Sequence, residues 1–172
     1  MPGLTPAYIG IGSNQAAPPR QLDAALAAIG RLPGTRLISV SRRYQSRPFG
    51  PVEQPDFLNA VAGVLTSLDA PALLAGLRGI EDAQGRVRSV RWGPRTLDLD
   101  LLVHGQTRLE TPALTLPHPG IVERNFVLYP LADIAPDLEI PGAGRVASLA
   151  ARISGDGIRV QPQSEGSRPL RR

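Results

Sequence analysis

Glycine and proline interrupt the apolar runs of this sequence throughout its length. There are 18 of each among 172 residues, and both residue types mark turns and the ends of helices and strands. The intervals between them are short, so the chain is expected to form many short elements rather than a helical bundle. No interval approaches the ~20 apolar residues that a membrane-spanning helix requires, so no membrane-spanning protein is expected.

Local patterns predict the order of the elements. The predicted segments are a strand over 7–12, a helix over 19–29, strands over 35–44 and 57–66, a helix over 71–83, a strand over 96–103, and short helices over 123–132 and 145–153. The order β-α-β-β-α-β is typical of an α+β ferredoxin-like sandwich, with a mainly antiparallel sheet and helices packed on it. We expect a single domain over 1–160 and a disordered basic tail over 161–172.

Charge and cysteine content exclude several classes of chemistry. All 19 basic residues are arginine, which excludes a P-loop lysine and a Schiff-base lysine. The chain has no cysteine, which excludes disulfides, thiolate nucleophiles and cysteine-based metal sites. The net charge of +4 allows nucleic acid or a phosphorylated small molecule as the partner. A cytoplasmic location is the expectation.

The segment from Arg91 to Leu102 carries the strongest functional signal. Because side chains alternate along a strand, one face is expected to carry Leu97, Leu99, Leu101 and Val103, and the opposite face Asp98 and Asp100. Two like charges about 7 Å apart at their Cα atoms raise each other's pKa unless cations neutralise them. Such oxygen ligands suit Mg²⁺, and paired carboxylates facing two metal ions are typical of phosphoryl transfer.

The alternative interpretation of this segment is a solvated face with ordinary ion pairs. Surface ion pairs contribute only ~0–1 kcal/mol, which gives little reason to gather four arginines and a tryptophan next to the aspartates. A polyphosphate site does give a reason, because guanidinium groups bind phosphate oxygens through paired hydrogen bonds. The four arginines are Arg86, Arg88, Arg91 and Arg95, and the tryptophan is Trp92.

Other polar and aromatic positions allow two interpretations each. Gly10-Ile-Gly12 lacks the third glycine of a dinucleotide fingerprint, so we expect its glycines to let the strand pass close to a ligand or another backbone. His118, between two prolines, is structural or exposed if taken alone, and His104 is interpreted as structural. Phe57 and Asn59, with Phe49, form either core or a surface for a flat heteroaromatic ligand.

Six motifs, taken together, resemble the 6-hydroxymethyl-7,8-dihydropterin pyrophosphokinases of folate biosynthesis. They are Ala7–Asn14, Gln54–Ala60, Gly85–Arg88, Arg91–Asp100, Leu116–Pro119 and Ile134–Asp137. The resemblance runs from about residue 6 to residue 138. It implies a ferredoxin-like fold and transfer of pyrophosphate from ATP to the pterin hydroxymethyl oxygen, with release of AMP and without a covalent intermediate.

The resemblance also implies roles for individual residues. Asp98 and Asp100 would hold two Mg²⁺ ions, and Arg86 and Arg95 would act with them as catalytic residues. The implied ATP-binding residues are Glu81, Arg88, Arg91, Trp92, Arg95, Leu101, His118 and Arg124. The implied pterin-binding residues are Ser46, Arg47, Phe49, Phe57, Asn59, Trp92 and Phe126, with Trp92 and Phe126 enclosing the bicycle. The implied partners are these two small molecules, for a monomer that binds neither nucleic acid nor membrane.

The chain departs from the family pattern at several positions. Ser46-Arg47 stands where threonine-proline is familiar, Phe57 replaces a frequent tyrosine, and Arg78 stands where a glutamine contacts adenine in some members. We therefore leave Arg78 out of the predicted site. The loops 10–16, 45–54 and 84–94 are predicted to act as lids over ATP.

Other function classes remain as alternatives at this point. An RNA-binding module of the same fold would need sheet aromatics in the ribonucleoprotein pattern, and that pattern is absent. A Mg²⁺-dependent phosphohydrolase or nucleotidyltransferase would share the paired aspartates, and the hydrolase would use water as acceptor. An inactive relative used only for binding is a further alternative.

Overall fold

A six-stranded antiparallel sheet lies at the centre of the computed structural model, which describes residues 3–48, 50–85 and 96–162. Its strands are β1 (Thr5–Ser13), β2 (Thr35–Val40), β3 (Tyr44–Ser46), β4 (Phe57–Thr66), β5 (Asp98–His104) and β10 (Ile158–Val160). The strand order is β10-β3-β4-β1-β5, and β2 pairs with β4 next to β3. The antiparallel pairing confirms the predicted fold class.

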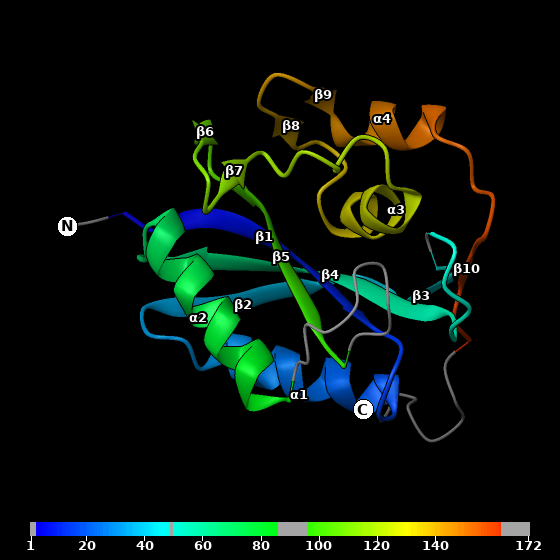
Figure 1. Cartoon of the computed structure of the whole chain (residues 1–172). Coiled ribbons are helices and arrows are strands. Elements are labelled where there is room, and N and C mark those ends of the chain that lie inside the picture. The colour runs from blue at the N-terminus through cyan, green and yellow to red at the C-terminus, as the bar shows by residue number, and fades with distance from the viewer. Residues whose placement is uncertain (1–2, 49, 86–95, 163–172) are drawn as a thin grey trace, which may run out of the picture.

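Helices cover both faces of this sheet (Figure 1). α1 (Pro18–Gly30) and α2 (Ala70–Ala83) pack on one face, and α3 (Asn125–Ile134) with α4 (Val146–Arg152) on the other. Two short hairpins, β6 (Leu109–Glu110) with β7 (Thr115–Leu116) and β8 (Glu139–Ile140) with β9 (Gly144–Arg145), complete the described elements. Each face of the sheet therefore has its own apolar core.

The helix that adjoins the predicted site begins at a well-formed cap. The Asp69 carboxylate accepts a hydrogen bond from the Ala72 N–H at 2.8 Å, which satisfies one of the free amide groups of the first turn of α2. Leu73, Leu77 and Ile80 follow at helical spacing and are buried against the sheet. Asp69 therefore marks where α2 begins, and the sequence pattern over 71–83 determines which face the helix buries.

The predicted strand over 35–44 is wrong in one respect, because the chain forms two strands there. β2 ends at Val40 and β3 begins at Tyr44. Between them, the Ser41 hydroxyl accepts a hydrogen bond from the Val61 N–H and donates one to the Arg42 C=O. A side chain thus takes the place of a ladder hydrogen bond, and the strand is interrupted.

The predicted alternation along β5 holds as far as Leu101 and fails beyond it. The register with β1 shifts there, with Ile9 opposite Leu101 and Tyr8 opposite Val103, so Leu102 has no cross-strand partner. This bulge turns both Leu102 and Val103 into the core beneath α3, whereas Leu101 packs beneath α2. Val103 therefore does not share a face with Leu97, Leu99 and Leu101.

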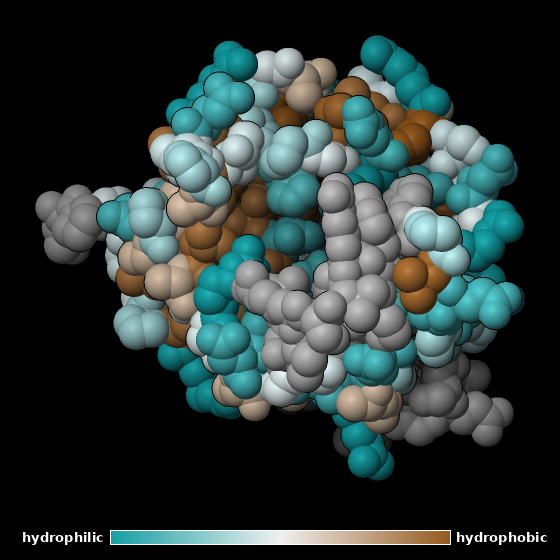
Figure 2. Space-filling view, in the orientation of Figure 1, coloured by the Kyte–Doolittle hydropathy of each residue, from teal (hydrophilic) through white to brown (hydrophobic). Residues whose placement is uncertain are grey.

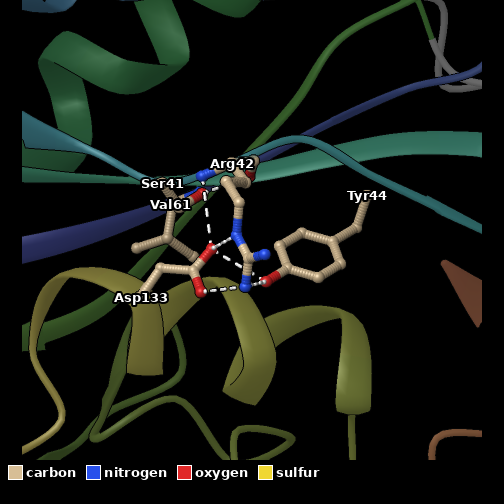
Figure 3. A network of polar contacts seen from close by, with 5 residues as sticks. All are labelled: Ser41, Arg42, Tyr44, Val61 and Asp133. Carbon is tan, nitrogen blue, oxygen red and sulfur yellow. Dashed lines mark hydrogen bonds and ion pairs between the residues drawn. The ribbon is translucent and has the colours of Figure 1, made fainter. Parts of the chain in front are cut away.

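A polar network joins the interruption between β2 and β3 to helix α3 (Figure 3). The Arg42 guanidinium donates to both carboxylate oxygens of Asp133, at 3.2 and 2.8 Å. The Tyr44 hydroxyl donates to the same carboxylate at 2.8 Å. Because Asp133 lies on α3, this network fixes α3 to the strand that continues into Ser46 and the predicted pterin loop.

The C-terminal part of the chain adds a strand that the sequence patterns did not predict. β10 pairs with β3, and beyond it the Gln161 N–H donates to the Arg43 C=O at 2.8 Å. The remainder of the predicted tail, 163–172, lies outside the described residues, as do 86–95 and residue 49. Within the described residues, no helix has the length and apolarity needed to cross a membrane.

Candidate functional site

The two predicted metal ligands lie beside glycines. Asp98 and Asp100 on β5 are paired across the sheet with Gly12 and Gly10 on β1. Because glycine has no side chain, the surface next to the two carboxylates stays open, and all four residues line one cavity of about 200 Å³. The other lining residues are Ile11, Ser46, Arg47, Phe57, Asn59, Ala60, Arg124, Phe126 and Val127.

The electrostatics of Asp100 agree with the expected repulsion between the two carboxylates. Burial of the carboxyl group and the charge of Asp98 together raise the pKa of Asp100 to about 7. Arg124 and Arg78 act in the opposite direction, and Glu81 adds a smaller upward shift. The Asp100 side chain keeps 32% of its surface exposed, and that surface faces the cavity. At Asp100, burial and the repulsion from Asp98 therefore outweigh the effect of the two cations on the pKa.

His118 faces Asp100 as a neutral side chain. Its Nδ1 accepts a hydrogen bond from the Gly120 N–H at 3.1 Å, so the geometry assigns the ring proton to Nε2. Nε2 lies 3.8 Å from the Asp100 Oδ1 atom. Burial and the nearby Arg124 charge lower the pKa of His118 to about 4, against an upward effect of Asp98. At neutral pH His118 therefore presents an N–H donor rather than a positive charge.

Arg124 supplies a positive charge in the cavity beside Asp100. Its guanidinium lies over the Phe126 ring, 5.9 Å from the ring centroid, which is within cation–π distance. It also packs against Gly120, where a Cβ atom would approach the Arg124 Nε to 2.6 Å. Gly120 therefore leaves the space that the guanidinium occupies. The sequence analysis did not select Gly120, because no local pattern marks this position.

The predicted pterin residues that the structure describes lie at the other end of the same cavity. The Asn59 amide donates to the Ser46 hydroxyl at 2.7 Å, which fixes the orientation of the amide. A Cβ atom at Gly12 would lie 3.1 Å from the Asn59 Oδ1, so the absence of a side chain at Gly12 leaves room for this amide. Phe57 and Phe126 contribute ring surface. Side chains rather than another backbone lie against Gly10 and Gly12, so the close approach of a ligand stays a prediction.

A second cavity of about 230 Å³ lies between α2, β5 and the segment 111–119. Figure 2 shows the hollow on this face, with an apolar floor and hydrophilic side chains beside it. Leu101 and His118, both predicted to contact ATP, line it together with Leu74. Arg78 lines it as well, although we left it out of the predicted site. Asp100 belongs to both cavities.

Glu81 occupies a different place from the other predicted ATP-binding residues. Its side chain is fully buried, and its Oε2 accepts a hydrogen bond from the Leu99 N–H at 2.9 Å. Glu81 thus contacts the backbone between the two aspartates. The remaining predicted residues, Phe49, Arg86, Arg88, Arg91, Trp92 and Arg95, lie outside the described residues.

Comparisons with known proteins identify the family. A profile described as 7,8-dihydro-6-hydroxymethylpterin-pyrophosphokinase (HPPK) matches residues 8–136. A Pseudomonas aeruginosa protein named 2-amino-4-hydroxy-6-hydroxymethyldihydropteridine pyrophosphokinase is 50% identical over 155 residues, which cover 90% of this chain and 96% of the relative. A Haemophilus influenzae protein of the same name is 46% identical over 148 residues, covering 86% and 92% respectively.

Solved structures agree with this result at the level of the fold. A crystal structure described as HPPK-DHPS in complex with substrates matches with a TM-score of 0.69 at 13% identity, over 87% of this chain and 43% of that chain. Plasmodium falciparum HPPK-DHPS, wild type with SDX-DHP, matches with a TM-score of 0.67 at 14% identity, over 86% and 44%. The chain thus spans less than half the length of these solved chains.

The fold is therefore the ferredoxin-like α+β fold that the element order predicted. The protein is an enzyme of the diphosphotransferase class. The chain belongs to the 7,8-dihydro-6-hydroxymethylpterin-pyrophosphokinase family, whose members transfer a pyrophosphoryl group to hydroxymethyldihydropterin in folate biosynthesis.

Proposed function

We propose that ATP donates the pyrophosphoryl group and that transfer takes place at Asp100. One observation carries this proposal, namely that Asp100 lines both cavities. A reaction between two substrates needs both of them to reach a common point, and much of the rate enhancement in such a reaction comes from holding the reactants together. The hydroxymethyl oxygen would attack the β-phosphorus, the bond from that phosphorus to the AMP portion would break, and AMP would leave.

The first cavity suits the pterin. A flat heteroaromatic bicycle needs ring surfaces for its faces and fixed polar groups for its edge. Phe57 and Phe126 offer the ring surfaces, and the Asn59 amide, oriented by Ser46, offers the polar edge. Arg47 lines the same cavity. Trp92 and Phe49 are proposed to complete this pterin site.

The second cavity suits the nucleotide. Leu74 and Leu101 provide apolar walls for a base, and His118, neutral at pH 7, provides an N–H donor for a phosphate oxygen. Arg124 places its positive charge next to Asp100, where phosphate groups would pass from one cavity to the other. Arg86, Arg88, Arg91 and Arg95 are proposed to bind the remaining phosphate oxygens, with Arg86 and Arg95 stabilising charge on the transferred group.

Two Mg²⁺ ions fit the acidic pair. Asp98 and Asp100 would hold them, since carboxylate oxygens are the ligands that Mg²⁺ prefers, and the raised pKa of Asp100 marks a site where a cation relieves repulsion. Among the described residues no group of three or more acidic or histidine side chains is placed to hold a metal. We therefore propose that water and substrate phosphates would supply the other ligands, as is usual for Mg²⁺. When bound, such ions neutralise charge on the phosphates.

Phosphorus NMR of the protein with ATP, Mg²⁺ and 6-hydroxymethyl-7,8-dihydropterin tests the proposal. We expect AMP and a pterin diphosphate from the wild type and from the control Asp137→Asn, whose carboxylate pairs only with Arg145 among the described residues. We expect neither product from Asp98→Asn. Formation of ADP or free phosphate instead would contradict the assigned acceptor, and an active Asp98→Asn variant would contradict the metal role.

The assembly state and location are part of the same proposal. We propose that the chain works as a monomer, as the family resemblance implies. Sedimentation equilibrium with substrates present tests this, and a stable dimer would contradict it. The proposed donor, ATP, favours a cytoplasmic location, and the proposed substrates include neither nucleic acid nor lipid.

A further inference from the structure

Strand β5, which carries both aspartates, lies at the edge of the sheet. It pairs with β1 on one side, and α2 packs along it on the other. Every second residue of such an edge strand directs its N–H and C=O groups away from the sheet. Leu99, between Asp98 and Asp100, is such a residue, and it is fully buried. Its outward backbone groups therefore need partners from the protein rather than from water.

Two side chains of α2 supply these partners. The Glu81 Oε2 accepts a hydrogen bond from the Leu99 N–H at 2.9 Å. The Arg78 Nη1 donates to the Leu99 C=O at 3.0 Å and to the Glu81 Oε1 at 2.7 Å. Arg78 and Glu81 are three residues apart, so they lie on one side of the helix. A carboxylate and a guanidinium thus occupy the positions that a neighbouring strand would fill.

We propose that Arg78 and Glu81 are positioning residues for the two aspartates. The N–H of Leu99 belongs to the peptide plane that begins at Asp98, and its C=O belongs to the plane that leads to Asp100. Holding both planes sets the direction in which each aspartate leaves the backbone, because the Cβ direction follows from the backbone dihedral angles. This inference rests on the proposed role of the aspartates as metal ligands.

The properties of each side chain suit this role better than direct substrate contact. Glu81 is fully buried, so its carboxylate acts through the backbone that it binds. Arg78 keeps 38% of its side chain exposed and lines the second cavity, yet one nitrogen atom holds both Leu99 and Glu81. A guanidinium can donate several hydrogen bonds in one plane, so Arg78 can brace β5 and border the cavity at once.

Variants on α2 separate positioning from a purely structural role. Arg78→Ala removes the donor to Leu99, Arg78→Lys keeps a positive charge and N–H donors but not the planar guanidinium, and Glu81→Gln alters the acceptor. Asp82→Asn is the matched control, because Asp82 is the next residue of the same helix and is exposed. If Arg78→Ala does not fold, Arg78→Lys and Glu81→Gln test the same inference.

Two readouts are needed. The first is the exchange rate of the Leu99 amide hydrogen in metal-free protein, measured by NMR. The second is the affinity of the protein for Mg²⁺ in the presence of α,β-methylene ATP, measured by calorimetry. The Mg²⁺ dependence of turnover with ATP is measured as well. For Arg78→Ala we expect faster exchange at Leu99 and Mg²⁺ affinity lower by on the order of tenfold, the usual effect of removing a group that orients a ligand. Arg78→Lys should recover part of both, and the KM for the pterin should stay within about twofold.

Two results would overturn the inference. Unchanged Mg²⁺ affinity in variants with fast Leu99 exchange would mean that the pair only stabilises the fold. Unchanged Leu99 exchange in both Arg78→Ala and Glu81→Gln would mean that the pair does not brace the strand at all. Failure of the proposed function looks different, because Asp98→Asn would then bind Mg²⁺ as tightly as the wild type.

Discussion

Asp133 and Asp100 show two opposite uses of the same side chain. Asp133 on α3 accepts hydrogen bonds from Arg42 and Tyr44 and forms an ion pair with the former (Figure 3). Asp100 on β5 lies beside a second carboxylate, and in the described part of the chain no hydrogen-bond donor reaches its oxygens. The folded chain itself satisfies the first carboxylate, whereas the second is the one for which we propose a bound cation.

The difference appears in the groups that surround each carboxylate. Burial and the hydrogen bond to Asp133 raise the pKa of the Tyr44 hydroxyl to about 12, so it remains a donor at neutral pH. At the other site the group with the raised pKa is Asp100, and the causes are its burial and the charge of Asp98. A carboxylate with such partners stabilises the fold, whereas the repulsion at Asp100 costs stability that the proposed cation would recover.

Replacing Asp100 by asparagine should have the largest effect, and the loss should fall on activity rather than on stability. We expect turnover to fall roughly 10³-fold or more, because a bound metal contributes several kcal/mol to transition-state stabilisation and each ~1.4 kcal/mol is a factor of ten. The folded protein should be at least as stable at pH 8, because a repulsive charge is gone. Steady-state kinetics and urea unfolding measure the two effects, and a less stable variant would contradict the comparison.

Replacing Asp133 by alanine should have the opposite pattern. We expect the free energy of unfolding to fall by about 2 kcal/mol, because the buried Tyr44 hydroxyl loses its acceptor, while kcat below the unfolding transition stays the same. The ion pair itself contributes little, since the Arg42 side chain is 63% exposed. Asp137→Ala is the control, because its pair with Arg145 is open to solvent. Equal destabilisation by both variants would show that the network contributes no more to the free energy of unfolding than an exposed ion pair does.

The pH dependence of stability sharpens the comparison further. The pKa of Asp100 in the folded protein is about 7, against ~3.9 in an unfolded chain. The protonated acid therefore favours folding, and this contribution is complete below about pH 4 and is lost as the pH rises through about 7. In EDTA, Asp100→Asn should gain stability relative to the wild type over this range. A constant difference from pH 4 to 8 in urea unfolding would contradict the assigned repulsion.

Replacing Gly120 by alanine should have the smallest effect. The new Cβ atom would lie 2.6 Å from the Arg124 Nε, so the guanidinium must move from the Phe126 ring. We expect KM for ATP to rise about threefold, which corresponds to the ~0.5–1 kcal/mol of an exposed cation–π contact. Stability should change little, because the displaced atoms end a flexible side chain. Isothermal titration with α,β-methylene ATP measures the effect, and unchanged affinity would remove Arg124 from the nucleotide site.

Much of the fold follows from local patterns. The spacing of apolar residues in α1 and α2 and the alternation around Asp98 and Asp100 predicted those elements within a few residues. These patterns work because each residue's preference depends on its immediate neighbours. The prediction of a single strand over 35–44 failed because the interruption depends on the Ser41 hydroxyl and the Val61 amide, which are 20 residues apart.

Alternation predicted that Asp98 and Asp100 share one face of a strand, and the neighbouring arginines favoured a metal site there. The family resemblance implied roles for Asn59, Phe126 and His118. The structure places all five residues at the two cavities, and their roles stay predictions. Arg78 was set aside because it departs from that resemblance, and only its contacts with Leu99 and Glu81 show what it does. Gly120 has no local pattern, since its importance comes from the guanidinium that packs against it.

By itself the sequence determined the order of the elements, the absence of lysine and cysteine chemistry, and the acidic pair on one face of a strand. Only the tertiary structure decided that Asp100 belongs to two cavities, that glycines lie opposite both aspartates, and that α2 braces the strand between them. The physical reason is distance along the chain. A periodic pattern depends on residues that are close together in the sequence. A cavity, or a hydrogen bond between a helix and a strand, forms between segments that come into contact only when the chain packs.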